Sequence, residues 1–228
     1  MALGQLMIDF APTFQSGAHT VLVPALCQLM DDQCPRVACN AASCIINFCD
    51  GAEPAVITQY ASPVLAKLAA LMQSQNRLIQ EEAISGVAAM ADACDEDFIP
   101  FYDLFMPFLR GVLEHAHGDA YAKMRGRTFE CVSMIALAVG PEKFGPDAHF
   151  VLEQLANFVR SGLPPDDPQH VYVNKAFARL CKVIGAAFAP YLKVVLPSVL
   201  ETARAEPDRV VVDADDQTPD SQQYDLLM

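Results

Sequence analysis

A helical unit that recurs about every 40 to 45 residues constrains this 228-residue chain more than any other feature. Each unit opens with an apolar segment, marked by a proline in most copies: LVPALCQLM, SPVLAKLAALM, LFMPFLRGVL, FVLEQLANFV and VVLPSVLETA. A second segment, rich in small residues, follows it: RVACNAASCIINF, RLIQEEAISGVAAMA, MRGRTFECVSMIALAV and VNKAFARLCKVIGAAF. The sequence therefore predicts a series of helix pairs.

A two-helix period of this length is typical of HEAT and armadillo repeats. We predict an all-α fold, a right-handed superhelical HEAT-repeat solenoid of about four and a half helix pairs, over residues 1–205. The predicted pairs cover residues 18–49, 54–92, 97–139 and 146–188, and a last first helix covers 190–205. Such a stack presents a long curved surface rather than a catalytic cleft, which favours a binding protein.

The composition fits this interpretation and narrows the partners. The hydrophobic fraction is 53%, as expected where each helix is covered on two sides. Lys and Arg number 15 against 28 Asp and Glu, a net charge of −13, which argues against nucleic acid because phosphates require a basic stripe. The acidity suits a basic protein partner, or it merely keeps an apolar stack soluble. Composition does not decide between these two.

Eight cysteines raise the question of a zinc site or disulfides. Four of them, at positions 34, 39, 44 and 49, are five residues apart, a spacing that turns successive helical side chains about 140° away from each other. The sequence has no CxxC or CxxH pair. We therefore predict buried, reduced thiols, no metal or other cofactor, and a location in the cytoplasm and nucleus, which are reducing.

Sequence motifs of the common enzyme classes are missing. The sequence contains no phosphate-binding glycine loop, no GxSxG and no HExxH. His115 and His117 are two residues apart and do not share a helix face. We predict that the chain is not an enzyme.

The two ends of the chain differ from the repeats between them. Residues 1 to about 11 look like the end of a second helix whose partner is missing, so we expect an interior fragment of a longer protein. Residues 206–228 accumulate aspartates among Gln, Ser, Thr and Pro, which predicts an acidic flexible tail or loop. The apolar stretch Leu180–Leu200 contains two lysines and two prolines, and we expect no membrane association.

The second helices carry the candidate binding residues, because these helices usually line the concave side of such stacks. Polar side chains recur there at positions that the core spacing leaves free: Asn40, Asn47, Glu81, Glu130 and Asn174. An amide can both donate to and accept from a peptide backbone, and a carboxylate can pair with a Lys or Arg head. We predict that these five residues bind an extended basic peptide; for each one alone, an ordinary solvated position is the alternative.

Several stretches also resemble the karyopherin-β (importin-β) family. YDLFMP (Tyr102–Pro107), RGRTFEC (Arg125–Cys131) and LAVGPEKF (Leu137–Phe144) are the most specific, and the similarity extends from about residue 2 to 205. The resemblance implies a nuclear transport receptor that binds nuclear localisation signals, contacts phenylalanine-glycine nucleoporins and releases cargo to Ran-GTP. It also implies that the repeats carrying most Ran contacts precede this segment. Beyond about Pro207 the chain departs from the family pattern.

We therefore predict a fragment of a nuclear import receptor, expected to be monomeric, that binds basic nuclear-localisation-signal cargo on the concave face of its solenoid. Regulation by Ran-GTP would belong to the full-length parent, through repeats outside this chain. The alternative is a HEAT-repeat scaffold for a protein complex that has no part in transport.

Overall fold

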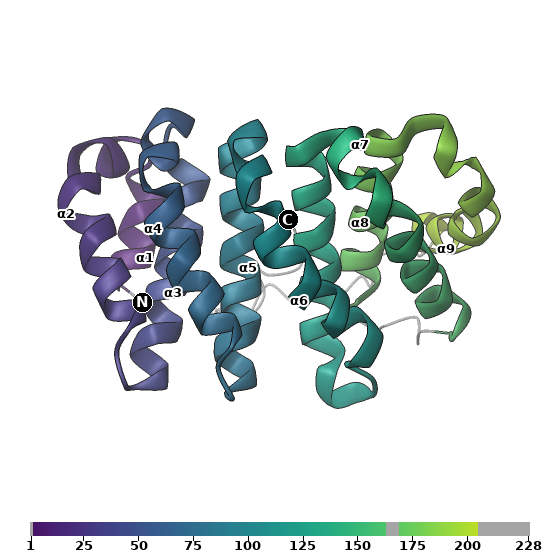
Figure 1. Ribbon diagram of the computed structural model, residues 1–228, viewed down its shortest axis with the longest axis horizontal. Coiled ribbons are helices and arrows are strands. Elements are labelled where there is room, and N and C mark those ends of the chain that lie inside the picture. Colours follow the sequence, from purple (N-terminus) through teal and green to yellow (C-terminus); the bar gives the residue numbers. More distant parts are fainter. Residues whose placement is uncertain (1, 163–168, 205–228) are drawn as a thin grey trace, which may run out of the picture.

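The computed structural model describes residues 2–162 and 169–204, and within these ranges the chain forms helices and no strands. The α-helices are α1 (Ala2–Asp9), α2 (Thr13–Met30), α3 (Pro35–Gly51), α4 (Pro54–Met72), α5 (Arg77–Cys94), α6 (Tyr102–His115), α7 (Ala122–Arg160), α8 (Gln169–Ile184) and α9 (Leu192–Arg204). Three 3-10 segments join them: η1 (Asp95–Phe101), η2 (Asp119–Tyr121) and η3 (Gly185–Tyr191). The helices stand side by side along one long axis (Figure 1).

The backbone repeats with the period seen in the sequence. Asp95, Gly140 and Gly185 all have positive φ, lie 45 residues apart, and each ends a second helix. Gly118 and Gly162 also have positive φ, lie 44 residues apart, and follow first helices. Gly140 lies inside α7 and divides it into a half before and a half after residue 140. The left-handed conformation, which glycine adopts at little cost, thus marks the turns of successive repeats.

The helices form two layers. The first helices of the pairs are α2, α4, α6, the second half of α7, and α9; the second helices are α1, α3, α5, the first half of α7, and α8. In Figure 1 α2, α4 and α6 lie nearer the viewer, and α1, α3 and α8 form the fainter, more distant layer. α3 contacts α5 more extensively than α2 contacts α4. Because the closer-packed layer lies on the inside of a curve, the second helices form the inner layer.

Small residues allow close packing both between the two layers and within the inner layer. A Cβ added at Gly86 of α5 would lie 2.8 Å from Leu68 Cδ2 of α4, and one at Gly126 of α7 would lie 2.7 Å from Tyr172 Cδ2 of α8. Larger side chains at the two glycines would push the neighbouring helices apart. The core runs through the whole stack, with Ile84 and Ile135 among its fully buried side chains.

The prolines of the first helices lie on the outside of the stack. Pro24, Pro63, Pro107 and Pro197 are inside α2, α4, α6 and α9, and all four are exposed. A proline within a helix leaves the carbonyl four residues earlier without its usual donor. At an exposed position water can satisfy that carbonyl, so the repeats tolerate these prolines.

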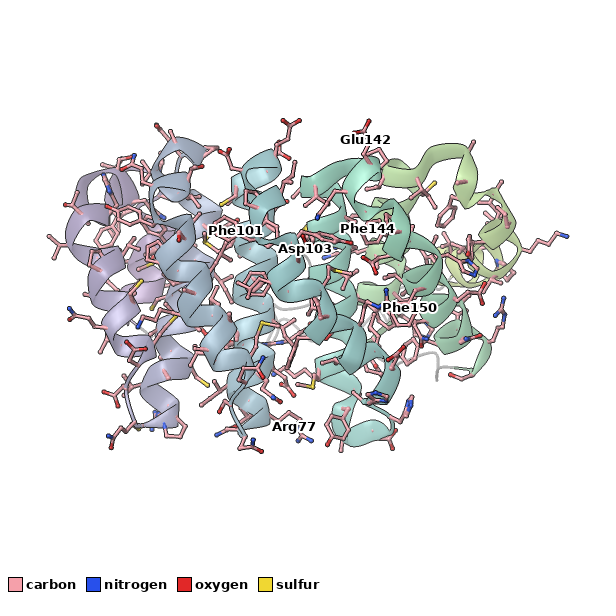
Figure 2. The ribbon with its side chains drawn as sticks, viewed as in Figure 1. Arg77, Phe101, Asp103, Glu142, Phe144 and Phe150 are labelled. Atoms are coloured by element: carbon pink, nitrogen blue, oxygen red, sulfur yellow. The ribbon has the colours of Figure 1, made fainter. Side chains whose placement is uncertain are left out.

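Polar contacts join successive first helices across the outer layer. His19 Nδ1 of α2 lies 2.9 Å from the Tyr60 hydroxyl of α4, and His149 Nδ1 of α7 lies 2.8 Å from the Tyr191 hydroxyl of η3. The guanidinium of Arg110 lies 4.2 Å from the ring centroid of Phe150, a residue on the second half of α7 (Figure 2). These polar groups of the outer layer therefore have partners in the neighbouring repeat.

The predicted all-α HEAT-type solenoid is confirmed. Residues Ala2–Asp9 form α1, which packs against α3 as a second helix would. The fourth first helix begins directly after Gly140 and not at 146 as predicted, because Pro141 occupies its first position, where a proline is favoured. The predicted acidic tail at 206–228 lies outside the described residues.

Two described segments are long and apolar enough to cross a membrane by length and composition: Pro54–Met72 and Gln169–Pro197. The first is α4, whose Leu65 and Leu68 are fully buried in the stack. The second is interrupted at Gly185, where α8 ends and η3 begins. Both segments are accounted for as packed repeat helices.

Candidate functional site

The inner layer contains an open cavity where α3, α5 and the first half of α7 adjoin. Its volume is about 360 Å³, and its polar lining comprises Asn47, Asp50, Ser85, Asp92 and Glu130. The remaining lining residues are mostly small or apolar: Ile46, Cys49, Ala88, Ala89, Ala93 and Met134. α5 lies in the middle and contributes short side chains, so the space above it stays open between the two neighbouring helices.

Three carboxylates from three successive repeats surround this cavity. Asp50 of α3 and Asp92 of α5 are exposed, and Glu130 of α7 is half-buried. None of the three has an ion-pair partner within residues 2–162 and 169–204. Like charges around one cavity repel each other, and a bound cation would relieve that repulsion.

The cavity also offers groups that suit the rest of a peptide. Asn47 is half-buried at its edge, and its amide can donate to a backbone carbonyl and accept from a backbone N–H. Ala88, Ala89 and Met134 provide an apolar surface on which a lysine stem can lie while its ammonium reaches a carboxylate. The arrangement can therefore hold an extended basic segment by both its backbone and its side chains.

The structure brings two of the five sequence-predicted residues together. Asn47 and Glu130 line the same cavity, although they belong to different repeats. Asn40 is exposed on α3, two helical turns before Asn47, and does not line the cavity. Asn174 is half-buried on α8 and does not line it either.

The fifth predicted residue, Glu81, does not project outward as expected. It is only 3% exposed, and its carboxylate lies 3.6 Å from Nε of Arg77 and 3.8 Å from Nζ of Lys123. The core spacing of α5 leaves position 81 at the side of the helix, where the first half of α7 covers it. The expected exposure is wrong because the neighbouring repeat buries the side chain; its role towards a ligand stays a prediction.

A polar network lies next to Glu81, at the start of α5, and joins this helix to both neighbouring helices of the inner layer. Ser43 Oγ of α3 donates to Glu82 Oε1 of α5 at 2.9 Å, and Arg127 Nη1 of α7 donates to Glu82 Oε2. Only about a fifth or less of the Glu82 and Arg127 side chains is exposed, at 21% and 16%. Glu82 thus links three successive second helices, α3, α5 and α7, by hydrogen bonds. The sequence analysis did not predict this structural role.

Asp50 and Asp92 were not among the sequence-predicted residues. The predicted second helices ended at residues 49 and 92, whereas α3 continues to Gly51 and α5 to Cys94. Asp50 therefore lies on α3, one residue past the predicted helix end, and Asp92 lies on α5, at the predicted helix end. They lie 42 residues apart, one repeat period, and aligning the repeats with each other could have revealed them.

None of the eight cysteines, all of which the structure describes, forms a disulfide. Burial disfavours the reactive thiolate form of the most enclosed ones. Cys44, Cys49, Cys94 and Cys131 are buried as predicted, whereas Cys34 and Cys181 are exposed. Desolvation raises the pKa of Cys94 to about 11, and it raises the pKa values of Cys49 and Cys131 as well. Within the part of the chain that the structure describes, no group of three or more His, Cys, Asp or Glu side chains could hold a metal ion.

Comparison with known proteins shows which family the chain belongs to. A family model described as "Importin subunit beta-1-like, TPR repeats" matches residues 30–224. The chain belongs to the importin-β family. The period of 44 to 45 residues in the backbone lies in the range of HEAT repeats and exceeds the 34 residues of a TPR unit.

Curated relatives agree with this assignment. Importin subunit beta-3 of Saccharomyces cerevisiae is 33% identical over 223 residues, which is 97% of this chain and 20% of the relative. The probable importin subunit beta-4 of Schizosaccharomyces pombe is 28% identical over 89% of this chain and 19% of the relative. The chain thus spans about a fifth of the length of these relatives. They are importins and not enzymes.

Solved structures of the karyopherin Kap121p share the fold. Kap121p bound to Pho4p superposes with a TM-score of 0.82 at 32% identity, over 97% of this chain and 21% of Kap121p. Kap121p bound to Nup53p gives a TM-score of 0.81, also at 32% identity and with the same coverage. This importin fold is what presents the cavity lined by Asn47, Asp50, Asp92 and Glu130.

Proposed function

We propose that this chain is a cargo-binding segment of a nuclear import receptor and that its inner cavity binds a basic nuclear-localisation segment in extended form. The observation that carries the proposal is the convergence of Asp50, Asp92 and Glu130 on one cavity without a cation of their own. Asn47 would hold the peptide backbone at the edge of the same cavity. Asn40, Asn174 and Glu81 stay predictions as further cargo residues.

The relatives support this proposal over a scaffold unconnected with transport. Kap121p has been solved bound to Pho4p, Ste12p, Nup53p, the SUMO protease Ulp1p and the extreme C-terminus of the phosphatase Cdc14p. A receptor with several protein partners fits an open cavity on a curved surface better than an enclosed pocket. We propose that the full-length parent shuttles between cytoplasm and nucleus, contacts phenylalanine-glycine nucleoporins, and is regulated by Ran-GTP through its other repeats. No catalytic step belongs to this function.

The binding of a fluorescent lysine-rich localisation peptide, measured by anisotropy, tests the proposal. The full chain should bind the peptide and lose affinity as salt rises, because the Debye length falls from about 10 Å at 0.1 M to about 3 Å at 1 M. The neutral triple variant Asp50→Asn, Asp92→Asn, Glu130→Gln should bind at least about tenfold more weakly, since three partly exposed ion pairs of up to about 1 kcal/mol each would be lost.

A matched control removes three carboxylates elsewhere. Glu53, Glu96 and Glu142 are exposed, have no ion-pair partner among the described residues, and lie at the starts of three successive first-helix segments. Glu142 lies at the upper edge of the molecule in Figure 2. Changing all three to Gln alters the net charge equally and should leave the affinity within about twofold, because these glutamates do not line the cavity and an exposed charge without a direct contact contributes little. Equal losses in the two triple variants would refute the site.

A further inference from the structure

The charge of the inner layer changes from acidic to basic at α8. This helix contains Lys175, Arg179 and Lys182 and no Asp or Glu, in a chain whose net charge is −13. Lys175 and Lys182 are both exposed and are seven residues apart, so they share one side of the helix. That side is opposite the buried residues Val173 and Leu180. We call Lys175, Arg179 and Lys182 the basic ridge.

Two contacts fix where the basic ridge lies relative to the acidic cavity. Tyr172 of α8 packs on Gly126 of α7, and Arg179 Nη1 donates to Ser133 Oγ of α7 at 3.3 Å. Lys175 lies between Tyr172 and Arg179 in the sequence, just as Glu130 lies between Gly126 and Ser133. Lys175 therefore stands at the level of Glu130, on the next second helix. The basic ridge continues the inner layer directly beyond the cavity.

No carboxylate in the described part of the chain contacts either exposed lysine of the ridge, Lys175 or Lys182. Cations three or four residues apart on a helix repel each other, as Lys175, Arg179 and Lys182 do. An anionic ligand would relieve this repulsion and would be drawn to the only second helix, among those described, that has basic and no acidic residues.

We propose that the basic ridge binds an anionic side chain of the same cargo segment whose basic residues occupy the cavity. The inference rests on the proposed function and adds a second charge to the signal that it recognises. The anion is a carboxylate or a phosphate, since both accept hydrogen bonds from Lys and Arg heads. The receptor would thus select a basic segment followed or preceded by an acidic or phosphorylated residue.

Helix packing sets the spacing of the two parts of the signal. Neighbouring packed helices have axes about 8–10 Å apart, and an extended peptide advances about 3.3–3.6 Å per residue. Passing from α7 to α8 therefore takes about three residues, and from α5 to α8 about six. The anionic residue should lie about three residues from the lysine that Glu130 contacts and about six from the lysine that Asp92 contacts.

Peptides that share one lysine-rich core test this inference against the full chain by fluorescence anisotropy. One peptide carries the core followed by neutral residues, one carries two aspartates at the proposed spacing after the core, one carries them before it, and one replaces them by phosphoserine. At least one anionic peptide should bind about threefold to tenfold more tightly than the neutral one, as expected for two or three partly exposed ion pairs. The aspartate and phosphoserine arms distinguish the two sources of the anion.

Variants of the ridge decide whether it causes that gain. Lys175→Gln with Lys182→Gln should abolish the gain and leave the neutral peptide unaffected, and both side chains are exposed, so the fold should persist. The control Lys193→Gln removes an exposed charge from α9 and should keep the gain. Equal affinity of all peptides, or a gain that survives the double variant, would overturn the inference. Failure of the neutral core peptide to bind at all would instead overturn the proposed function, and the inference with it.

Discussion

Carboxylate side chains lie at both the start and the end of α5, but their surroundings differ. Near its start, Glu81 is buried against Arg77 and Lys123, and Glu82 bonds to Ser43 and Arg127. Near its end, Asp92 is exposed on the cavity and has no ion-pair partner in the described part of the chain.

The difference separates carboxylates that hold repeats together from carboxylates that are available to a ligand. A paired and partly buried carboxylate contributes to stability and is costly to unpair. An exposed carboxylate among like charges contributes little to stability and gains from a bound cation. The two regions of α5 should therefore respond oppositely to mutation.

Charge reversal at the cavity should have the largest effect on binding. The variant Asp50→Lys, Asp92→Lys, Glu130→Lys should lose about 100-fold or more in affinity for the lysine-rich peptide, because three attractive contacts of about 1 kcal/mol each become repulsive. Its urea midpoint should stay close to that of the wild type, since these side chains are exposed or half-buried. Anisotropy and urea unfolding, measured on the same samples, check both halves of this expectation.

The start of α5 should respond in the opposite way. Glu82→Ala should destabilise the fold by about 1–3 kcal/mol, because Arg127, only 16% exposed, loses its partner. Peptide affinity should change less than about threefold, a modest rim effect. In urea unfolding, Arg127→Ala should cost a similar amount, and the double variant should cost less than the sum of the two. Additive losses would show that the two side chains do not interact.

Glu81 sharpens the comparison. The helix pattern in the sequence predicts that it contacts a ligand, whereas its burial indicates that it stabilises the fold. Glu81→Gln should lower the free energy of unfolding by about 1 kcal/mol through weaker contacts with Arg77 and Lys123. The matched change Glu130→Gln should leave stability unchanged and weaken peptide binding. If Glu81→Gln instead weakens binding at unchanged stability, position 81 belongs with the ligand contacts.

The close packing of α5 predicts unequal effects of two glycine substitutions. Gly86→Ala should destabilise by about 1 kcal/mol or more, because its Cβ would lie 2.8 Å from a methyl group of the fully buried Leu68. Gly111→Ala, in the outer helix α6 with no atom within 4 Å of the new Cβ, should stabilise by about 0.5–1 kcal/mol. Thermal or urea unfolding measures both changes. Equal effects of the two variants would mean that α5 is packed no more closely at Gly86 than α6 is at Gly111.

Alkaline pH should have the smallest effect, through Cys94 at the end of α5. Burial raises the pKa of this thiol from 9.0 to about 11, so the folded state disfavours the thiolate. The stability that this shift contributes is complete below pH 9 and is lost as the pH rises to about 11. The stability difference between the wild type and Cys94→Ala should therefore shrink over that range. A difference that does not vary with pH would mean that the thiol is not desolvated.

Most of the fold could be predicted from the sequence, because the evidence for it is local. The period of the helix pairs, the turn at Gly118, and the core positions such as Ile45 and Val132 follow from spacing within one or two helices. The candidate site could be predicted only in part. Asn47 and Glu130 were found because both lie on the outward side of their own helix. Asp50 was missed because it lies in the last turn of α3, beyond the predicted helix end, where sequence boundaries are least certain. Asp92 was inside its predicted helix, and only the cavity between three helices marks it.

The sequence by itself determined that this chain is a stack of paired helices with an acidic surplus, since helical periodicity and charge are properties of consecutive residues. Only the tertiary structure decided which carboxylates are free. Glu81 and Glu82 meet cations that lie about 40 to 45 residues further along the chain, whereas Asp92 and Glu130 meet none within the described residues. Those contacts depend on the register between repeats, which close packing at residues such as Gly126 sets.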